Sequence, residues 1–130
     1  MKTNSNSPLV SVVDDDQSIR EAMESLLLGF GFQVELFSSA EEFLSSPLLN
    51  ETSCLVLDIS MGGMSGLELQ RHLAARSHQI PIIFLTAHGS KYNEWRAKHF
   101  GATAFLRKPF GSCELLQVLS TALNIPLIEE

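Results

Sequence analysis

Short apolar runs recur along the chain and predict the strands of a sheet. Four of them are almost continuously apolar and rich in branched side chains: Leu9–Val13, 54–57, 80–85 and 104–106. That pattern is typical of central strands in a parallel sheet whose two faces are both covered. A weaker fifth run, Gln33–Phe37, alternates polar and apolar residues, as an edge strand does.

Apolar residues spaced three or four positions apart predict helices between these runs. The first stripe consists of Ile19, Met23, Leu26, Leu27 and Phe30. Its helix should be capped by Asp16 and should end near Gly29 and Gly31. A last stripe predicts a final helix with Ser112 as its N-cap. That stripe consists of Leu115, Val118, Leu119 and Ala122.

The order of these elements predicts the fold class. Shorter helices are expected over Ala40–Leu44, Gly66–Ala75 and 91–98, and a loop is expected over 45–53. Strand and helix thus alternate five times, which predicts an α/β fold with a doubly wound five-stranded parallel sheet and five helices. A thioredoxin-like sheet is the alternative, but it needs mixed strand directions and usually a Cys-x-x-Cys pair, which the sequence lacks.

Composition narrows the class of protein. The 130 residues include 9 Lys and Arg against 15 Asp and Glu, a formal charge of −6, and one domain is expected at this length. This acidic balance argues against a nucleic-acid-binding surface, which needs clustered basic residues. No apolar run approaches the roughly 18 residues of a membrane span. Residues 1–8 are polar and lack the apolar core of a signal peptide, so we expect a cytoplasmic protein.

Polar residues follow the predicted strands, and they are the candidates for chemistry. They are Asp14, Asp15 and Asp16 after the first strand, Asp58 after the third, Thr86 after the fourth, and Lys108 with Pro109 after the fifth. In an open parallel sheet, ligands bind at the carboxyl ends of the strands. Residues far apart in the sequence should therefore meet at one edge of the sheet.

The types of these residues indicate phosphoryl chemistry. Crowded carboxylates repel one another, and a hard divalent cation such as Mg²⁺ or Mn²⁺ compensates them. Lys108 and Thr86 could bind the oxygens of a phosphoryl group. Asp58 is the most natural nucleophile, because aspartate is a known covalent phosphoryl acceptor.

Four motifs resemble the receiver domain of bacterial two-component response regulators. They are Val12-Val13-Asp14-Asp15-Asp16, Leu57-Asp58, Leu85-Thr86-Ala87 and Lys108-Pro109-Phe110, in the same order and spacing as in that family. The segment 61–69 resembles the loop and helix start that follow the phospho-acceptor there. The stretch Leu85-Thr86-Ala87-His88-Gly89 further resembles the FixJ/NarL (LuxR-type) subgroup. This resemblance implies a flavodoxin-like sheet with strand order 2-1-3-4-5.

The resemblance also implies a role for each candidate residue. Asp58 would receive a phosphoryl group from a phosphohistidine, and the domain would catalyse this transfer and the later dephosphorylation itself, as a stoichiometric acceptor rather than an enzyme. Asp15 would bind the metal ion directly and Asp14 mainly through water, with Asp58 and the Ser60 carbonyl as further ligands. Thr86 and Lys108 would hold the phosphoryl group. Phe105 would turn inward when Thr86 moves, and the Lys108–Pro109 bond would be cis.

The partners implied are a sensor histidine kinase and a second copy of the domain. Dimerisation would use the face formed by the fourth helix, fifth strand and fifth helix, and DNA would be contacted only through an output domain. We expect the receiver over 8–123, a flexible flank over 1–7, and a tail or linker start over 124–130. No effector follows Asn124, so the chain is either a stand-alone receiver or a fragment of a longer transcriptional regulator, and the subgroup resemblance favours the fragment.

Two departures and two rival functions accompany this interpretation. Gly62 stands where the family usually has Pro, which predicts a looser loop, and the helix over 91–98 is not Ala-rich as in the family. A phosphatase of the haloacid-dehalogenase type would also use an aspartyl phosphate, but it needs a second acid where Ser60 stands. A degenerate receiver that serves only as an interaction module is the other rival, and the intact candidate residues argue against it.

Overall fold

The computed structural model describes residues 7–87 and 91–126 and contains one five-stranded parallel sheet. Its strands, in the spatial order β2-β1-β3-β4-β5, are β1 (Leu9–Val13), β2 (Gln33–Phe37), β3 (Cys54–Asp58), β4 (Ile82–Thr86) and β5 (Ala104–Arg107). The predicted fold class and strand order are thereby confirmed. Of the flanks predicted over 1–7 and 124–130, residues 1–6 and 127–130 lie outside the described part of the chain.

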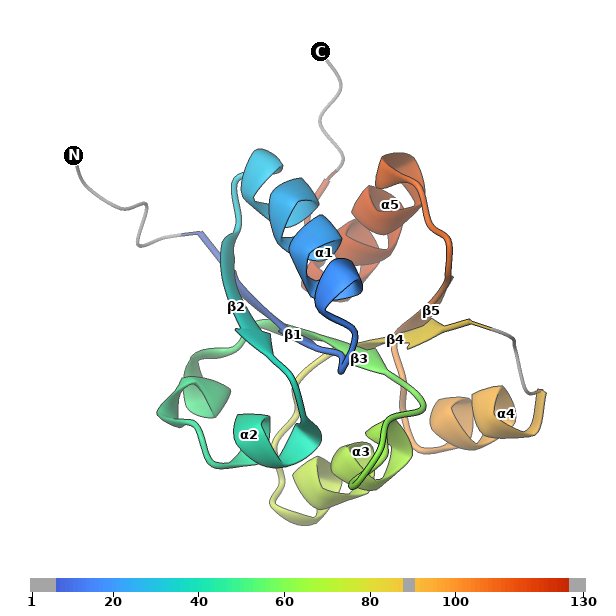
Figure 1. Cartoon of the computed structure of the whole chain (residues 1–130). Helices are drawn as coiled ribbons and strands as arrows, with labels where there is room; N and C mark the ends of the chain where they lie inside the picture. Colours follow the sequence, from blue (N-terminus) through green and yellow to red (C-terminus); the bar gives the residue numbers. More distant parts are fainter. Residues whose placement is uncertain (1–6, 88–90, 127–130) are drawn as a thin grey trace.

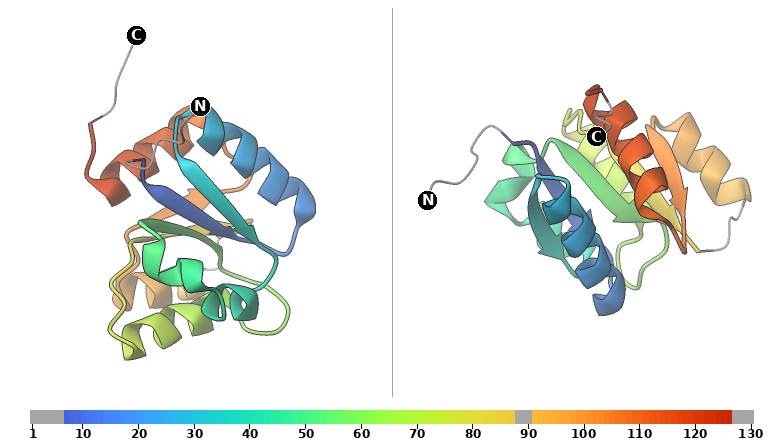
Figure 2. Two further views of the ribbon diagram at one scale, coloured as in Figure 1. Left: turned by 90° about the vertical axis from the view of Figure 1, so that its left-hand side faces the viewer. Right: turned by 90° about the horizontal axis from the view of Figure 1, so that it is seen from above.

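Helices cover both faces of the sheet, so that the molecule has three layers (Figures 1 and 2). One face carries α1 (Gln17–Gly29) and α5 (Ser112–Leu123), and the other carries α2 (Ala40–Leu44), α3 (Gly66–Ala75) and α4 (Lys91–His99). Among the described helices, none combines the length and the apolar composition needed to cross a lipid bilayer.

The core lies in two layers, one on each side of the central strands. Every residue of β1, β3 and β4 is buried, whereas β2 alternates between exposed and more buried positions. This matches the continuous and alternating patterns of the sequence, because successive side chains of a strand point to opposite faces. Leu57 and Phe84 thus pack toward α2 and α3, while Val56 and Leu85 pack toward α1 and α5.

Local polar contacts set the ends of the helices. The backbone N–H of Ser18 donates to the Asp16 carboxylate at 2.9 Å, which confirms Asp16 as the cap of α1. Ser65 and Glu68 form a reciprocal capping box at the start of α3. The prediction that Ser112 is the N-cap of α5 is wrong.

Gly111 is the residue that precedes the first turn of α5. Ser112 is already the first helical residue, and the Glu114 carboxylate accepts a 2.6 Å hydrogen bond from the Gly111 N–H. The sequence pattern did not indicate this arrangement, because here the capping side chain comes from inside the helix.

The strands and helices differ slightly from their predicted bounds. β4 begins at Ile82 rather than at residue 80, because Pro81 has no N–H to donate to the sheet. β3, β4 and β5 each extend by one polar residue, so that Asp58 and Thr86 are the last residues of their strands. The predicted loop over 45–53 contains a 3₁₀ helix, Pro47–Glu51, and α4 ends at His99 rather than at residue 98.

Gly66 allows α3 to begin directly against the end of β3. A Cβ atom at this position would lie 2.3 Å from the Asp58 carbonyl oxygen. Since that neighbour is backbone, no side-chain rearrangement relieves the clash, and Gly66→Ala must displace α3 or Asp58. We expect the substitution to lower the free energy of unfolding by about 1–3 kcal/mol, measured by urea denaturation.

Gly62→Ala is the matched control for this prediction. A Cβ at Gly62 meets no atom within 4 Å, so its free energy of unfolding should change by less than about 0.5 kcal/mol. Equal stabilities of the two variants would contradict the close approach of α3 to β3.

Candidate functional site

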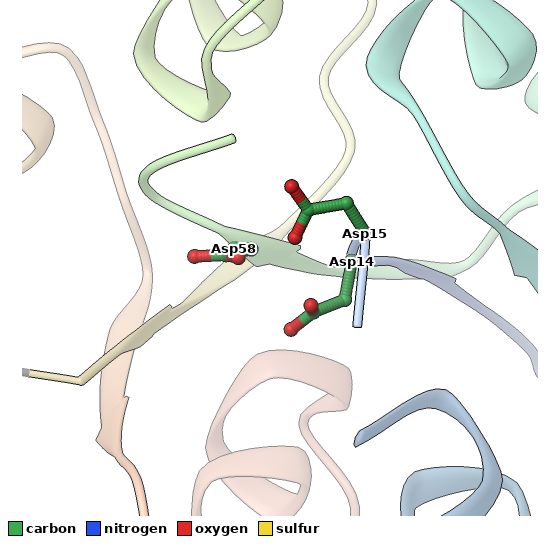
Figure 3. Close-up of side chains that lie close together, drawn as sticks. All are labelled: Asp14, Asp15 and Asp58. Atoms are coloured by element: carbon green, nitrogen blue, oxygen red, sulfur yellow. The ribbon is translucent and has the colours of Figure 1, made fainter. Parts of the chain in front are cut away.

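Three aspartates meet where the strand order reverses. β1 has β2 on one side and β3 on the other, and Asp14 follows β1 directly while Asp58 ends β3. The chain pairs Val13 with Leu57 across the two strands, which brings the following carboxylates together. Carboxylate oxygens of Asp14, Asp15 and Asp58 all lie within 4.8 Å of one another (Figure 3). We call this group the acidic pocket.

Lys108 reaches the acidic pocket from the end of the edge strand β5. It follows β5, which is separated from β3 by β4, and its N–H donates to the Thr86 carbonyl at 2.8 Å. Its side-chain Nζ lies 3.0 Å from Asp14 Oδ2 and 3.6 Å from Asp58 Oδ2. The Lys108–Pro109 peptide bond is cis. One ammonium group therefore contacts two of the three carboxylates.

The three aspartates differ in burial, and burial disfavours the ionised form of Asp58. Asp14 is fully buried and Asp58 is 6% exposed, whereas Asp15 is exposed. Burial raises the pKa of the Asp58 carboxyl to about 6, and the charges of Asp14 and Asp15 act in the same direction. The Ser60 N–H and Lys108 oppose this shift without cancelling it.

The same surroundings favour the charged form of Lys108. Burial disfavours its charge, but the carboxylates of Asp14 and Asp58 outweigh burial and raise its pKa above the ordinary value. Lys108 is therefore firmly protonated and supplies a fixed positive charge at the edge of the acidic pocket.

The acidic pocket has the features of a site for a divalent cation. Three carboxylates and one ammonium leave a formal charge of −2 when all are ionised. Asp14 Oδ2 is buried and, besides the Lys108 contact, makes no hydrogen bond among the described residues. An oxygen-rich, negatively charged set of this kind suits Mg²⁺, which takes one or two protein carboxylates and keeps several waters.

Backbone contacts orient the side chain of Asp58. Its Oδ1 accepts a 3.1 Å hydrogen bond from the Ser60 N–H, and the Ile59 N–H donates to the Leu85 carbonyl at 3.0 Å. Thr86 ends the neighbouring strand and is 1% exposed. The carboxylate of Asp58 is thereby fixed beside β4 while its Oδ2 faces Lys108.

Phe105 and the start of the β4–α4 connection complete the list of predicted site residues. Phe105 is half-buried and stacks on Phe84, with ring centroids 6.0 Å apart. Ser60 is exposed beside Asp58. His88 and Gly89, which belong to the motif after Thr86, lie outside the described residues. The structure therefore groups Asp14, Asp15 and Asp58, and Lys108 contacts Asp14 and Asp58. Thr86 lies at the adjacent strand end, and Phe105 lies two residues before the end of β5.

Two supporting residues escaped prediction from the sequence. Arg20 of α1 donates from Nη1 to the Asp14 carbonyl at 2.8 Å, which holds the turn that carries Asp14. Glu41 of α2 accepts a 3.0 Å hydrogen bond from the Met64 N–H, which ties down the loop after Asp58 where Gly62 stands. Glu41 and Met64 are 23 positions apart in the sequence. Arg20 lies only six residues after Asp14, and the signal available there was that Arg20 is the sole basic residue of α1.

The raised pKa of Asp58 predicts a pH-dependent gain in stability when its charge is removed. A carboxyl that titrates near 6 when folded and near its ordinary value of 3.8 when unfolded stabilises the fold when protonated. This contribution is lost as the pH rises from about 4 to 6. In metal-free buffer at about pH 7.5, Asp58→Asn should therefore raise the free energy of unfolding by about 1–3 kcal/mol.

The gain should shrink toward zero near pH 4, measured by urea denaturation in the presence of a chelator. Asp16→Asn is the control, because an exposed cap tolerates Asn and should change stability little at either pH. If Asp58→Asn instead lowered the free energy of unfolding at neutral pH without metal, the raised pKa of Asp58 would be contradicted.

Comparisons with known proteins agree with this arrangement. The sequence pattern of the response regulator receiver domain matches residues 10–120. Response regulator protein TmoT of Ectopseudomonas mendocina is 41% identical over 122 residues, which are 94% of this chain and 56% of that protein. Nodulation protein W of Bradyrhizobium diazoefficiens is 44% identical over 118 residues, 91% of this chain and 52% of its own.

Solved structures give the same result. The response regulator StyR superposes with a TM-score of 0.84 at 47% identity, covering 91% of this chain and 60% of that one. FixJ-N superposes with a TM-score of 0.83 at 31% identity, covering 95% of this chain and 99% of that one. The chain spans about half the length of the curated relatives it matches. By sequence pattern, fold and acidic pocket alike, the chain belongs to the receiver domains of two-component response regulators.

Proposed function

We propose that this receiver accepts a phosphoryl group on Asp58 from a phosphohistidine of a sensor histidine kinase. The observation that carries the proposal is the convergence of three carboxylates within 4.8 Å, with the Lys108 ammonium 3.6 Å from Asp58 Oδ2. Asp58 is the last residue of β3 and retains 6% exposure at the edge of the sheet where a donor would approach.

The transfer is a single displacement at phosphorus. An Asp58 oxygen forms a bond to phosphorus while the P–N bond of the phosphohistidine breaks, and the imidazole leaves with the electron pair. Asp14, Asp15 and Asp58, with the Ser60 carbonyl, would hold Mg²⁺ or Mn²⁺, which neutralises charge on the phosphoryl oxygens when bound. The domain thus catalyses its own phosphorylation and its later dephosphorylation, as a stoichiometric acceptor.

Lys108 and Thr86 then stabilise the acyl phosphate. Lys108 is held by Asp14 at 3.0 Å and needs to move little to pair with a phosphoryl oxygen on Asp58. Thr86 ends the neighbouring strand and offers a hydroxyl to the same group. Phe105 lies on β5, next to the strand that carries Thr86, and its half-buried ring would pack more deeply when Thr86 shifts.

Partner proteins recognise this conformational change. The altered face of α4, β5 and α5 supports a phosphorylation-dependent homodimer and contact with an output domain. The relative FixJ of Azorhizobium caulinodans is named a transcriptional regulatory protein, and this chain covers 54% of its length. We therefore infer a cytoplasmic regulator whose DNA-binding output lies outside the receiver at 8–123, while a stand-alone receiver is the alternative.

A phosphatase of the haloacid-dehalogenase type is disfavoured by the surroundings of Asp58. Such an enzyme needs a carboxylic acid two residues after its nucleophile, and Ser60 is at that position. Ser60 contributes its N–H to Asp58 Oδ1 and has no group able to protonate a leaving alcohol at neutral pH.

Removing the Asp58 carboxylate should abolish phosphorylation. With Mg²⁺ and radiolabelled acetyl phosphate, the unmodified chain should take up at most one phosphoryl group per molecule, and Asp58→Asn should take up none, because an amide is not a nucleophile here. Asp16→Asn, which alters the neighbouring exposed acid, should retain full labelling. Unchanged labelling of Asp58→Asn would overturn the proposal.

Asp15 should contribute mainly to metal affinity. Asp15→Asn removes an exposed carboxylate from the acidic pocket without leaving a buried charge unpaired. We expect Mg²⁺ to bind it at least about tenfold more weakly, measured by titration calorimetry, with little loss of stability in metal-free buffer. An unchanged Mg²⁺ affinity would place the cation elsewhere.

A further inference from the structure

Helix α4 carries a glutamate on the side that faces the sheet. Glu94 lies three residues before Ala97, which is fully buried in the core layer that also contains Phe84. Positions three apart lie on the same side of a helix, so Glu94 also faces the sheet, and its side chain is only 24% exposed. A charged group that is largely withdrawn from water needs a partner of opposite charge.

Arg107, the last residue of β5, is that partner. Its Nη2 lies 3.3 Å from Glu94 Oε2. This oxygen is buried and accepts no hydrogen bond among the described residues, so the guanidinium compensates its charge. The Arg107 side chain is itself 64% exposed, and ion pairs with an exposed member change an equilibrium by at most about fivefold. The pair therefore joins α4 to the end of β5 through a weak contact.

This contact lies beside the residues that the proposed function moves. Arg107 is the Cα partner of Thr86 across β5 and β4, as Phe105 is of Phe84. Phe84 and Phe105 stack on the side of the sheet that α4 covers. Because alternate residues of a strand point to the same face, Thr86 and Arg107 lie on that side as well. The Glu94–Arg107 ion pair is therefore next to both Thr86 and Phe105.

We propose that the Glu94–Arg107 ion pair stabilises the unphosphorylated arrangement of α4 and β5 and so opposes the switch that follows phosphorylation of Asp58. The inference rests on the proposed function, in which Thr86 shifts toward the phosphoryl group and Phe105 packs more deeply. An interaction that is made in only one of two states shifts the equilibrium toward that state by its own free energy. Glu94 and Arg107 are thus positioning residues, because neither contacts the reacting atoms.

The connections of the two residues explain why a switch separates them. Arg107 is followed by Lys108, whose N–H donates to the Thr86 carbonyl at 2.8 Å, so the end of β5 moves with Thr86. Glu94 instead belongs to α4, whose position is tied to α3 by the 3.0 Å hydrogen bond from Gln70 Nε2 to the Ala97 carbonyl. A shift of Thr86 therefore moves Arg107 relative to Glu94.

The test uses beryllofluoride, which mimics a phosphoryl group on a carboxylate. Its affinity for the 130-residue chain is measured by fluorine-19 nuclear magnetic resonance at saturating Mg²⁺. Glu94→Gln and Arg107→Gln should each bind it about two- to fivefold more tightly, because neither variant has an ion pair to break. The double variant should bind it no more tightly than the single variants, because both substitutions remove the same interaction.

The two substitutions distinguish loss of the ion pair from a change of charge. Glu94→Gln removes a negative charge and Arg107→Gln removes a positive one, so an electrostatic effect alone would shift the affinity for an anion in opposite directions. Glu51→Gln and Arg76→Gln are the matched controls, because they make the same charge changes at exposed positions near the opposite edge of the sheet. Both should bind beryllofluoride within about 1.5-fold of the unmodified chain.

A second measurement needs neither metal nor beryllofluoride. Urea denaturation of the unmodified chain, the two single variants and the double variant, with a chelator present, gives the coupling between Glu94 and Arg107. We expect the pair to change the unfolding equilibrium constant by about two- to fivefold. Arg107→Gln should destabilise the fold more than Glu94→Gln, because it leaves Glu94 Oε2 buried without a partner.

Three results would overturn the inference. These are the absence of coupling in the denaturation cycle, unchanged or weaker beryllofluoride binding by either single variant, and opposite shifts for the two variants. If the unmodified chain itself bound no beryllofluoride, the proposed function would fail, and this inference with it. That result is distinguishable from binding that the substitutions at Glu94 and Arg107 leave unchanged.

Discussion

The mutual repulsion of three carboxylates is the constraint on which the site depends. A chain that gathers Asp14, Asp15 and Asp58 within 4.8 Å loses stability unless opposite charge is supplied. Lys108 supplies part of it, 3.0 Å from Asp14 and 3.6 Å from Asp58. Burial, together with the charges of Asp14 and Asp15, raises the pKa of Asp58 to about 6, and the negative charge that remains favours a divalent cation. The acidic pocket is thus a locally unfavourable arrangement of charges that a bound cation would stabilise.

The sheet makes this arrangement possible because its strand order reverses at β1. Asp14 and Asp58 stand at the ends of adjacent parallel strands, and β4 then places Thr86 next in line. Lys108 comes from beyond β4, and its backbone is tied to the end of that strand through the Thr86 carbonyl. Any shift at the end of β4 is therefore transmitted to the lysine that pairs with Asp58. This connection gives the proposed switch a physical route from the phosphoryl group to β5.

Much of the fold and site could be predicted because the relevant signals are local. Continuous apolar runs mark buried strands, and polar residues at their ends must meet at one edge of the sheet. The contacts of Arg20 with Asp14 and of Glu41 with Met64 could not be predicted, because they depend on how side chains of α1 and α2 reach neighbouring loops. The ring contacts of His99 with Trp95 and Phe100 could not be predicted either, because helical spacing alone does not tell which aromatic residues the core leaves exposed.

Nuclear magnetic resonance of the aspartate and glutamate side-chain carboxyl carbons offers the most direct test of the acidic pocket. Without metal, the Asp58 carboxyl should titrate near pH 6, well above an ordinary aspartate, and substoichiometric Mn²⁺ should broaden Asp14, Asp15 and Asp58 together before any other acidic residue. An ordinary pKa near 3.8 for Asp58, or earlier broadening of the glutamate signals of α1 and α2, would contradict this account. Either result would show that the acidic pocket is not where the cation binds or where the carboxyl pKa is raised.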